Sequence, residues 1–312
     1  MIAGRQTTVR DVVALSGYGV HSAAVANISI RPASPNHGIV FLRTGLEGGI
    51  ERRIPARYGN VSMTELCTVL GNPSHGAVST VEHIMAALYG LGIDNALIEI
   101  DGPEVPIMDG SAGMFVDALR AVGVERQRSP RRYVRVLKPV SVSNKIGTSA
   151  LLPHDDDVLR LDVSIEFDTS VIGTQNMTLD LQPETFAAEV SRARTFGFMR
   201  DVEQLWKNGF ALGASLENTV AIGDDRVINP EGLRFEDEFV RHKMLDAVGD
   251  LALAGLPIVG LFRSRCGGHR LNISVLRELF SDPANFEICE AETAVPARNV
   301  QMAAAAYAPA LS

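Results

Sequence analysis

The chain is poor in cysteine, and its few cysteines are far apart. Cys67, Cys266 and Cys289 are the only three in 312 residues. A disulfide-stabilised secreted protein typically has an even and denser set. Because an odd, scattered set fits free thiols, we expect the protein to reside in a reducing compartment, the cytoplasm.

The chain also lacks an excess of positive charge and a long hydrophobic run. Its 37 acidic residues outnumber its 29 basic residues, for a formal net charge of −8, which argues against a non-specific nucleic-acid binder. The N-terminus contains no apolar signal core. The longest apolar run, Leu251 to Phe262, is interrupted by Gly255 and Pro257 and is too short to cross a bilayer. We therefore expect neither nucleic-acid binding nor stable membrane insertion, and no sequence feature indicates an obligate protein partner.

What is present is an ordinary globular composition in a chain long enough for two domains. Apolar residues make up 46% of the chain and charged residues 21%, as in a protein with a sizeable core. Residues 125–132 are polar, basic and interrupted by Pro130. Such a run could contact phosphates, but a solvated linker is the favoured interpretation. It divides the chain into domains of residues 1–127 and 133–312.

The two halves share a loosely repeated order of elements. A helix from Ser79 to about Tyr89 precedes a strand over Asn95–Ile100, and a helix from about Phe239 to Ala254 precedes a strand over Ile258–Phe262. Further strands are expected at Val134–Val142, Leu159–Phe167 and Thr178–Leu181. The pattern predicts an α+β fold of two pseudo-symmetric domains. Each would be a β-sheet packed on helices, with a histidine-containing helix from each domain, and hence the active site, at the domain interface.

Two short segments contain the residue types of a metal site. His83 ends the segment Ser79–His83, and His242 and Asp246 lie four residues apart in Arg241–Asp246. Side chains at that spacing share one face of a helix. Two imidazoles and one carboxylate leave an open position for water, as a catalytic zinc site needs. If the segments meet in space, the sequence predicts a site of His83, His242 and Asp246, suited to zinc or to ferrous iron.

Several of the polar residues in these segments have a plainer alternative. Glu82 stands three residues after a serine, which is the spacing of a capping box, so it could bond the helix start instead of acting as a general base. His242, Asp246 and Asp250 recur every four residues, as a solvated helix face also would. His269 follows two glycines and could be an acid, an oxyanion donor or a plain loop residue. Spacing alone leaves these choices open.

The segment from Thr195 to about Ile228 is dense in large apolar side chains. They are Phe196, Phe198, Met199, Val202, Leu205, Trp206, Phe210 and Leu212. The pattern predicts a short helix over Arg200–Asn208 and a strand over Thr219–Ile222. A stripe of this kind is core by default, and the alternative is an insert that lines an apolar groove. Taken alone, the pattern favours the core.

Ordered blocks along nearly the whole chain resemble the UDP-3-O-acyl-N-acetylglucosamine deacetylases, the zinc amidases of lipid A (lipopolysaccharide) synthesis. In chain order the blocks are Ser16–His21, Ser79–His83, Gly90–Asn95, Pro103–Ser111, Ser191–Phe198, Gly232–Asp246 and Gly268–Asn272. The resemblance implies hydrolysis of the N-acetyl group of UDP-3-O-acyl-N-acetylglucosamine, with release of acetate. It also implies two domains, each a sheet against helices, with the site between them.

The resemblance gives each candidate residue a role. It implies a zinc site of His83, His242 and Asp246, with Glu82 as general base, His269 as general acid, Asp250 as the residue that orients His269, Thr195 as an oxyanion contact and Lys243 as a substrate-facing cation. Residues 197–228 become an insert that forms an acyl-chain tunnel, which replaces the core interpretation. Substrate contacts are implied for Phe167, Phe196, Phe198, Trp206, Phe210 and Leu212, with Phe167 stacking on uracil. Pro103–Ser111 keeps the structural role of a rigid turn before a helix.

One position departs from the family pattern. A lysine near the substrate phosphates is usual three residues before the glycine-loop histidine, but Cys266 stands there in this chain. Arg265 and Arg270 are the nearby cations that could replace it. Two other functions are compatible with the residues: a metal-independent binding or scaffold protein of the same fold, and a metal hydrolase of another N-acetyl sugar. The apolar segment 197–228 argues against the second.

Overall fold

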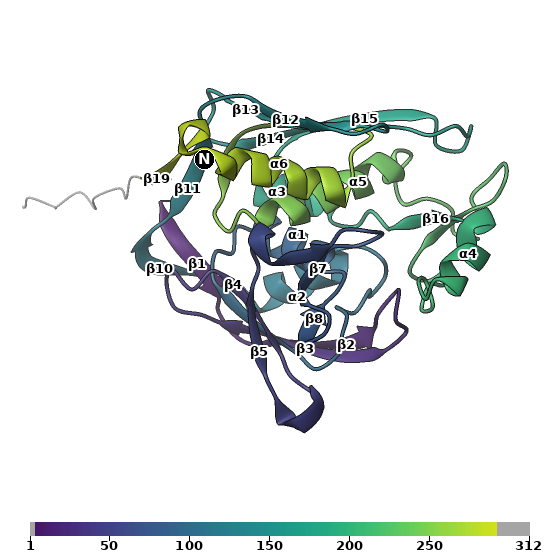
Figure 1. The fold of residues 1–312 in the computed structure, drawn as a ribbon, viewed down its shortest axis with the longest axis horizontal. Helices are drawn as coiled ribbons and strands as arrows, with labels where there is room; N and C mark the ends of the chain where they lie inside the picture. Colours follow the sequence, from purple (N-terminus) through teal and green to yellow (C-terminus); the bar gives the residue numbers. More distant parts are fainter. Residues whose placement is uncertain (1–3, 292–312) are drawn as a thin grey trace, which may run out of the picture.

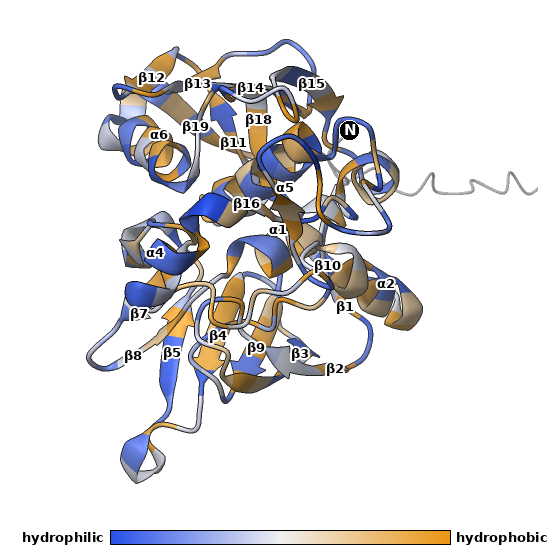
Figure 2. Cartoon of the chain, turned by 90° about the vertical axis from the view of Figure 1, so that its right-hand side faces the viewer, coloured by the Kyte–Doolittle hydropathy of each residue, from blue (hydrophilic) through white to orange (hydrophobic). Residues whose placement is uncertain are grey.

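Mixed helices and sheets make up the computed structural model, which describes residues 4–291 and confirms the expected α+β class. Two main sheets lie on opposite sides of a central layer of helices (Figures 1 and 2). Within the described residues, no helix is long and apolar enough to cross a membrane.

The N-terminal half builds a five-stranded sheet in the order β2-β3-β9-β4-β5. These strands are β2 (Val13–Tyr18), β3 (Val25–Pro32), β9 (Ala96–Ile100), β4 (Ile39–Arg43) and β5 (Arg52–Pro55). Buried and half-buried residues alternate along β9, because successive side chains of a strand point to opposite faces. A small sheet of β6 (Val61–Met63), β7 (Val69–Asn72) and β8 (Gly76–Val78) leads into helix α1 (Glu82–Gly90). Helix α2 (Gly113–Val122) ends at Gly123, whose φ of 83° favours glycine.

The C-terminal half builds a seven-stranded sheet. Its main path is β12 (Val140–Ser143), β13 (Thr148–Leu152), β18 (Ile258–Arg265), β11 (Arg132–Val136) and β19 (Phe286–Glu290), while β14 (Leu159–Glu166) pairs with both β18 and β15 (Thr174–Asp180). Helices α5 (Glu238–Ala252) and α6 (His269–Ser281) pack against this sheet and against each other. A short helix α3 (Pro183–Thr185) and a π-helical turn over Phe186–Val190 precede the segment of large apolar residues.

The expected linker is a strand instead. Residues Val124–Pro130 form β10, which pairs antiparallel with β1 (Arg5–Val9). Gln127 anchors the strand, because its amide donates to Ala33 O at 2.7 Å and accepts from the Asn95 amide at 2.8 Å. A polar, basic sequence can form a strand where a distant strand supplies the hydrogen bonds. The linker interpretation of 125–132 is therefore wrong, and the division into domains 1–127 and 133–312 stays a prediction.

The segment of large apolar residues lies at one side of the molecule. It contains β16 (Phe196–Phe198), which pairs in parallel with β17 (Val220–Ile222), and helix α4 (Val202–Lys207) (Figure 1). Trp206 is 55% exposed and Leu212 is 50% exposed, so the core interpretation is wrong for this part of the segment. Backbone bonds from Leu212 N to His21 O and from Gly213 N to Val20 O attach the segment to the N-terminal half.

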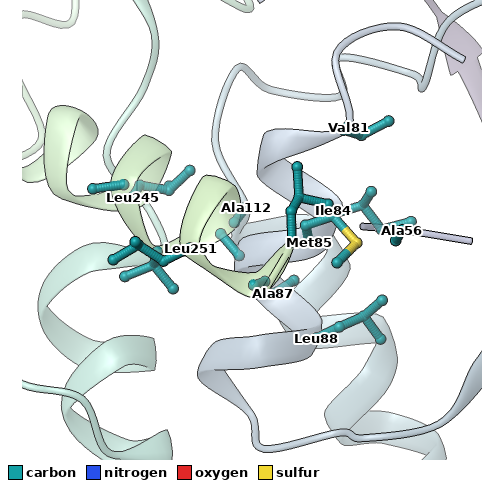
Figure 3. Packing of buried hydrophobic residues seen from close by; sticks show 14 of the residues in the cluster. Ala56, Val81, Ile84, Met85, Ala87, Leu88, Ala112, Leu245 and Leu251 are labelled. Atoms are coloured by element: carbon teal, nitrogen blue, oxygen red, sulfur yellow. The ribbon is translucent and has the colours of Figure 1, made fainter. Parts of the chain in front are cut away.

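Helices α1 and α5 pack against each other at the centre of the molecule. Apolar side chains surround the contact, as Figure 3 shows for Ile84, Met85, Ala87, Leu245 and Leu251. Gly249 permits the close approach, because a Cβ at that position would press on the carbonyl group of Glu82 and lie 3.0 Å from its Cα. The backbone of Glu82 therefore rests directly on α5, the helix that also carries His242 and Asp246.

Substitution Gly249→Ala should destabilise the fold and displace the start of α1. The new methyl group meets backbone atoms of Glu82, which cannot rotate away, and overpacking of this kind typically costs about 1–3 kcal/mol. Urea unfolding measures the change. Gly59→Ala is the matched control, because an added Cβ there meets nothing within 4 Å. Equal stability of the two variants would show that the α1–α5 contact tolerates a wider spacing.

Candidate active site

The structure brings the three predicted metal ligands together. His83 is the second residue of α1, and His242 and Asp246 face it from α5. Asp246 Oδ1 lies 3.7 Å from His83 Nε2 and 3.4 Å from His242 Nε2. One ligand atom from each of the three buried residues lies within 4.8 Å of the other two. The two segments do meet in space, and their donor atoms could hold a metal ion.

The hydrogen bonds around this cluster fit metal ligation. Nδ1 of His242 lies 3.0 Å from Ala193 O. Because a carbonyl only accepts, Nδ1 carries the proton and the Nε2 lone pair faces the cluster. Burial lowers the pKa of His242 to about 3 against the opposing charge of Asp246, so the imidazole is neutral, as a ligand must be. Nδ1 of His83 is buried and has no partner among the described residues.

Asp246 is held in its charged form. Burial raises the pKa of its carboxyl group, but the positive charge of Lys243, which also donates a hydrogen bond to the carboxylate, outweighs that effect and holds the pKa well below the usual range. Lys243 donates from Nζ to Asp246 Oδ2 at 2.9 Å, which leaves Oδ1 on the side of the two histidines. Burial lowers the pKa of Lys243, but the negative charge of Asp246 raises it by more, so the net effect is a raised pKa.

Glu82 does not cap its helix. Helix α1 begins at Glu82 itself, and no side chain within residues 4–291 bonds its N-terminus, so the capping-box interpretation is wrong. Instead Glu82 Oε2 accepts a bond from Thr68 N at 3.0 Å, and Oε1 lies 3.8 Å from His269 Nε2. Burial raises the pKa of Glu82, although His269 and His83 oppose the shift. A buried carboxylate with a raised pKa beside a metal cluster is suited to accept a proton.

His269 and Asp250 form a buried pair. His269 is the first residue of α6 instead of a loop residue, and its Nδ1 lies 2.8 Å from Asp250 Oδ2. Burial opposes the charge of the imidazole, but Asp250 and Glu82 outweigh it and raise the pKa of His269 to about 10. The imidazolium form therefore prevails at neutral pH. Since His242, Asp246 and Asp250 are 2%, 3% and 0% exposed, the solvated-face interpretation of this stripe is wrong.

One cavity of about 230 Å³ connects the polar cluster to the apolar segment. Its lining includes His83, Glu82, His242, Asp246, His269, Thr195 and Lys243, together with Phe196, Leu205, Ala211 and Ala214. The ammonium group of Lys243 lies 5.4 Å from the ring centroid of Phe196, a distance at which a cation and a ring attract. The predicted catalytic residues other than the fully buried Asp250 thus share one cavity, with an apolar wall from the segment after Thr195.

A second cavity of about 450 Å³ adjoins the first, and Leu66, Lys243 and His269 line both. Phe167, Cys266 and Arg270 also line it. Arg265 does not line this cavity: its side chain is 72% exposed, and its guanidinium group lies 3.4 Å from Glu166, which does line it. Of the expected substrate contacts, Phe196 lines the first cavity and Phe167 the second, whereas four line neither of these two cavities: Phe198, Trp206, Phe210 and Leu212.

Three polar residues near the site have no individual role predicted from the sequence. His21 lines the first cavity, and its Nδ1 accepts a bond from Ala211 N at 3.3 Å. Glu104, within Pro103–Ser111, is 1% exposed and accepts bonds from His21 N and from the Thr80 hydroxyl. Thr68 bonds both Glu82 and Asp250. His21 lies within the block Ser16–His21 and Glu104 within Pro103–Ser111, whereas Thr68 lies outside every block and no local spacing pointed to it.

Comparison with known proteins decides the family. The model of the UDP-3-O-acyl N-acetylglycosamine deacetylase family matches residues 6–281. The chain belongs to this family. Proteins named UDP-3-O-acyl-N-acetylglucosamine deacetylase from Brucella ovis and Brucella abortus are each 49% identical to it over 287 residues, which is 92% of this chain and 99% of each relative. The protein of that name from Brucella melitensis is 48% identical over the same length. Family membership confirms the resemblance seen in the ordered blocks.

Each of the substitutions His83→Ala, His242→Ala and Asp246→Ala should lower the metal content of the purified protein, because each removes one of three donors. Elemental analysis of protein exposed to zinc measures the loss. His75→Ala, at an exposed histidine outside the site, is the matched control and should retain the metal of the unaltered chain. Full retention in all three site variants would place the metal elsewhere.

Proposed function

We propose that this protein is a zinc-dependent deacetylase that hydrolyses the N-acetyl group of UDP-3-O-acyl-N-acetylglucosamine and releases acetate, in the biosynthesis of lipid A. One observation carries the proposal: the donors of His83, His242 and Asp246 converge in one cavity with Glu82 and His269. The names of the Brucella relatives support the choice of substrate. The three free cysteines fit the cytoplasmic location that we propose for the reaction.

The donor set supports a resident metal. His83, His242 and Asp246 supply two imidazole nitrogens and one carboxylate oxygen, with the tautomer of His242 set by Ala193 O. Such a set suits zinc and ferrous iron, and we propose zinc because the sequence resembles zinc amidases. When bound, the metal supplies Lewis acidity that polarises the amide carbonyl and the attacking water. Metal-free protein is reloaded with zinc or with ferrous iron, and the rate of acetate release is compared between the two metals.

Glu82 and His269 divide the proton transfers. Glu82, held by Thr68 N, accepts the proton of the water that attacks the acetamide carbonyl. His269, protonated and held by Asp250, donates its Nε2 proton to the amine nitrogen as the C–N bond breaks. The two groups lie 3.8 Å apart, so one carboxylate and one imidazolium are close enough to serve the same reacting centre. Paired groups with pKa values moved apart are suited to act as base and acid.

Thr195 and Lys243 complete the polar side of the site. Thr195 lines the cavity beside the metal cluster, where its hydroxyl can donate to the oxyanion that forms on the carbonyl oxygen. Lys243 lines both cavities and is the cation that faces bound substrate. We propose that Arg270, which lines the second cavity, contacts the nucleotide phosphates in place of the missing lysine at Cys266. Phe167 in the same cavity is the proposed partner of the uracil ring.

Substitution Glu82→Gln tests the proposed function. The amide keeps the shape of the side chain but cannot accept the proton of water, so acetate release should fall by about 10²–10⁴-fold while bound metal is unchanged. Glu47→Gln, at an exposed position, should keep the normal rate. The assay compares UDP-3-O-acyl-N-acetylglucosamine with the non-acylated UDP-sugar. A faster reaction on the non-acylated sugar would identify a hydrolase of another substrate, and no reaction on either by metal-loaded protein would favour a binding protein.

The pH dependence of kcat/KM should be bell-shaped, with the high-pH limb belonging to His269. Asp250 is the largest contribution that raises the pKa of His269, so Asp250→Asn should move this limb to lower pH. His269→Ala should remove the limb and slow the reaction. A pH–rate series on the three proteins measures both effects. A high-pH limb of unchanged position in His269→Ala would mean that another group donates the proton.

Bulk added to the apolar wall should alter acyl selectivity more than chemistry. Ala214 lines the first cavity beside Leu205 and Ala211, and each buried methylene of a substrate is worth about 0.8 kcal/mol. In Ala214→Phe, KM should therefore rise more for a long-acyl substrate than for a short-acyl analogue, at constant metal content. A series of chain lengths measures the trend. Equal rate losses at every length would show that this wall does not hold the acyl chain.

A further inference from the structure

Thr68 contacts both sides of the proposed proton-transfer machinery. It lies directly before β7 and is fully buried, with 0% of its surface exposed. Its backbone N–H donates to Glu82 Oε2 at 3.0 Å, and its hydroxyl donates to Asp250 Oδ1 at 2.6 Å. An ionised carboxylate only accepts hydrogen bonds, which fixes these directions. One residue of the loop before β7 thus joins a carboxylate of α1 to a carboxylate of α5.

The bond to Asp250 determines how that carboxylate faces His269. Asp250 Oδ2 accepts hydrogen bonds from His269 Nδ1 at 2.8 Å and from the Asn272 amide at 2.9 Å. Within the described part of the chain, the Thr68 hydroxyl is the one group that donates a hydrogen bond to Oδ1. Without that hydroxyl, a buried lone pair has no donor, and the carboxylate can turn about its Cβ–Cγ bond to find one. Such a turn would carry Oδ2 away from the His269 ring, because the two oxygens move together.

The bond from the Thr68 backbone N–H to Glu82 orients the other carboxylate that faces His269. With Oε2 held by Thr68 N, Oε1 is the oxygen that faces His269 Nε2, at 3.8 Å. Hydrogen bonds therefore link Glu82 to Thr68, Thr68 to Asp250 and Asp250 to His269. The 3.8 Å approach of His269 to Glu82 completes the ring of contacts. The hydrogen bonds of Thr68 to the site go to Glu82 and Asp250 and not to the three metal donors, and Thr68 is not among the residues that line the first cavity.

We propose that Thr68 is a positioning residue for the deacetylation, one that sets the orientation of Asp250, and through it His269, relative to Glu82. This inference rests on the proposed roles of Glu82 and His269. Outer hydrogen-bond partners at metal centres typically contribute about 10–100-fold to activity, and we expect an effect of that order for Thr68. A merely structural hydroxyl would affect stability and leave the chemical step unchanged.

The first test compares three substitutions in metal-loaded full-length protein. Thr68→Val keeps the shape and the N–H but removes the hydroxyl, and kcat should fall by about 10–100-fold while KM and metal content stay within about threefold. Thr68→Ser keeps the hydroxyl and should restore most of kcat. Thr8→Val is the matched control, because it removes a buried hydroxyl bond of 2.7 Å to Asn95 O away from the site, and it should leave kcat unchanged. A normal kcat in Thr68→Val would overturn the proposal.

The second test asks whether Thr68 acts through Asp250. If it does, the double variant Thr68→Val with Asp250→Asn should lose little more kcat than Asp250→Asn alone, because both changes disturb the same orientation of His269. Losses that multiply would overturn the proposal. Should Thr68→Val not fold, Thr68→Ala against Thr68→Ser makes the same comparison, and equal kcat in those two would also overturn it.

Glu82→Gln and His269→Ala, measured in the same assay, distinguish failure of the proposed function from failure of the inference about Thr68. Normal rates in both would remove the proposed roles of base and acid, and with them the basis of the inference. Slow reaction in both, together with a normal kcat in Thr68→Val, would remove the inference and leave the proposed function intact.

Discussion

The close packing of α1 on α5 is the constraint on which the candidate site depends. Helix α1 carries Glu82 and His83, and helix α5 carries His242, Asp246 and Asp250. Neither helix alone has the complete set of proposed metal ligands and proposed proton-transfer groups. Gly249 lets the backbone of Glu82 rest on α5, so the spacing of two helix axes becomes the spacing of the reactive groups. Interiors packed at crystal-like density hold such a spacing firmly.

The site concentrates buried negative charge, and the rest of its electrostatics follows from that. Glu82, Asp246 and Asp250 are all 3% exposed or less. Buried carboxylates are costly unless they are paired and hydrogen-bonded. Lys243 pairs with Asp246, and His269 lies between Asp250 and Glu82, which explains why the pKa values of both cations are raised. A divalent cation at the three metal donors would offset the charge further.

Local patterns predicted the long elements well and misjudged those whose burial depends on distant partners. The helix expected from about Phe239 to Ala254 is α5 over Glu238–Ala252, because a 3.6-residue repeat and a following glycine are local signals. Residues 125–132 were misread as a linker, since β1 supplies the pairing from the other end of the domain. Composition alone predicts that Trp206 and Leu212 belong to the core, yet both are exposed. The capping-box interpretation of Glu82 failed because Thr68 holds its carboxylate instead.

The sequence by itself determined the ligand types, the four-residue spacing of His242 and Asp246, the ordered family blocks and the α+β class. These depend on residue chemistry and helix periodicity, which are short-range properties. The tertiary structure alone decided how closely His83 meets His242 and Asp246, that Arg270 and not Arg265 lines the second cavity, and that Thr68 bonds Asp250 from 182 residues away. Contacts over such separations follow from how helices and sheets pack, and no local repeat encodes that packing.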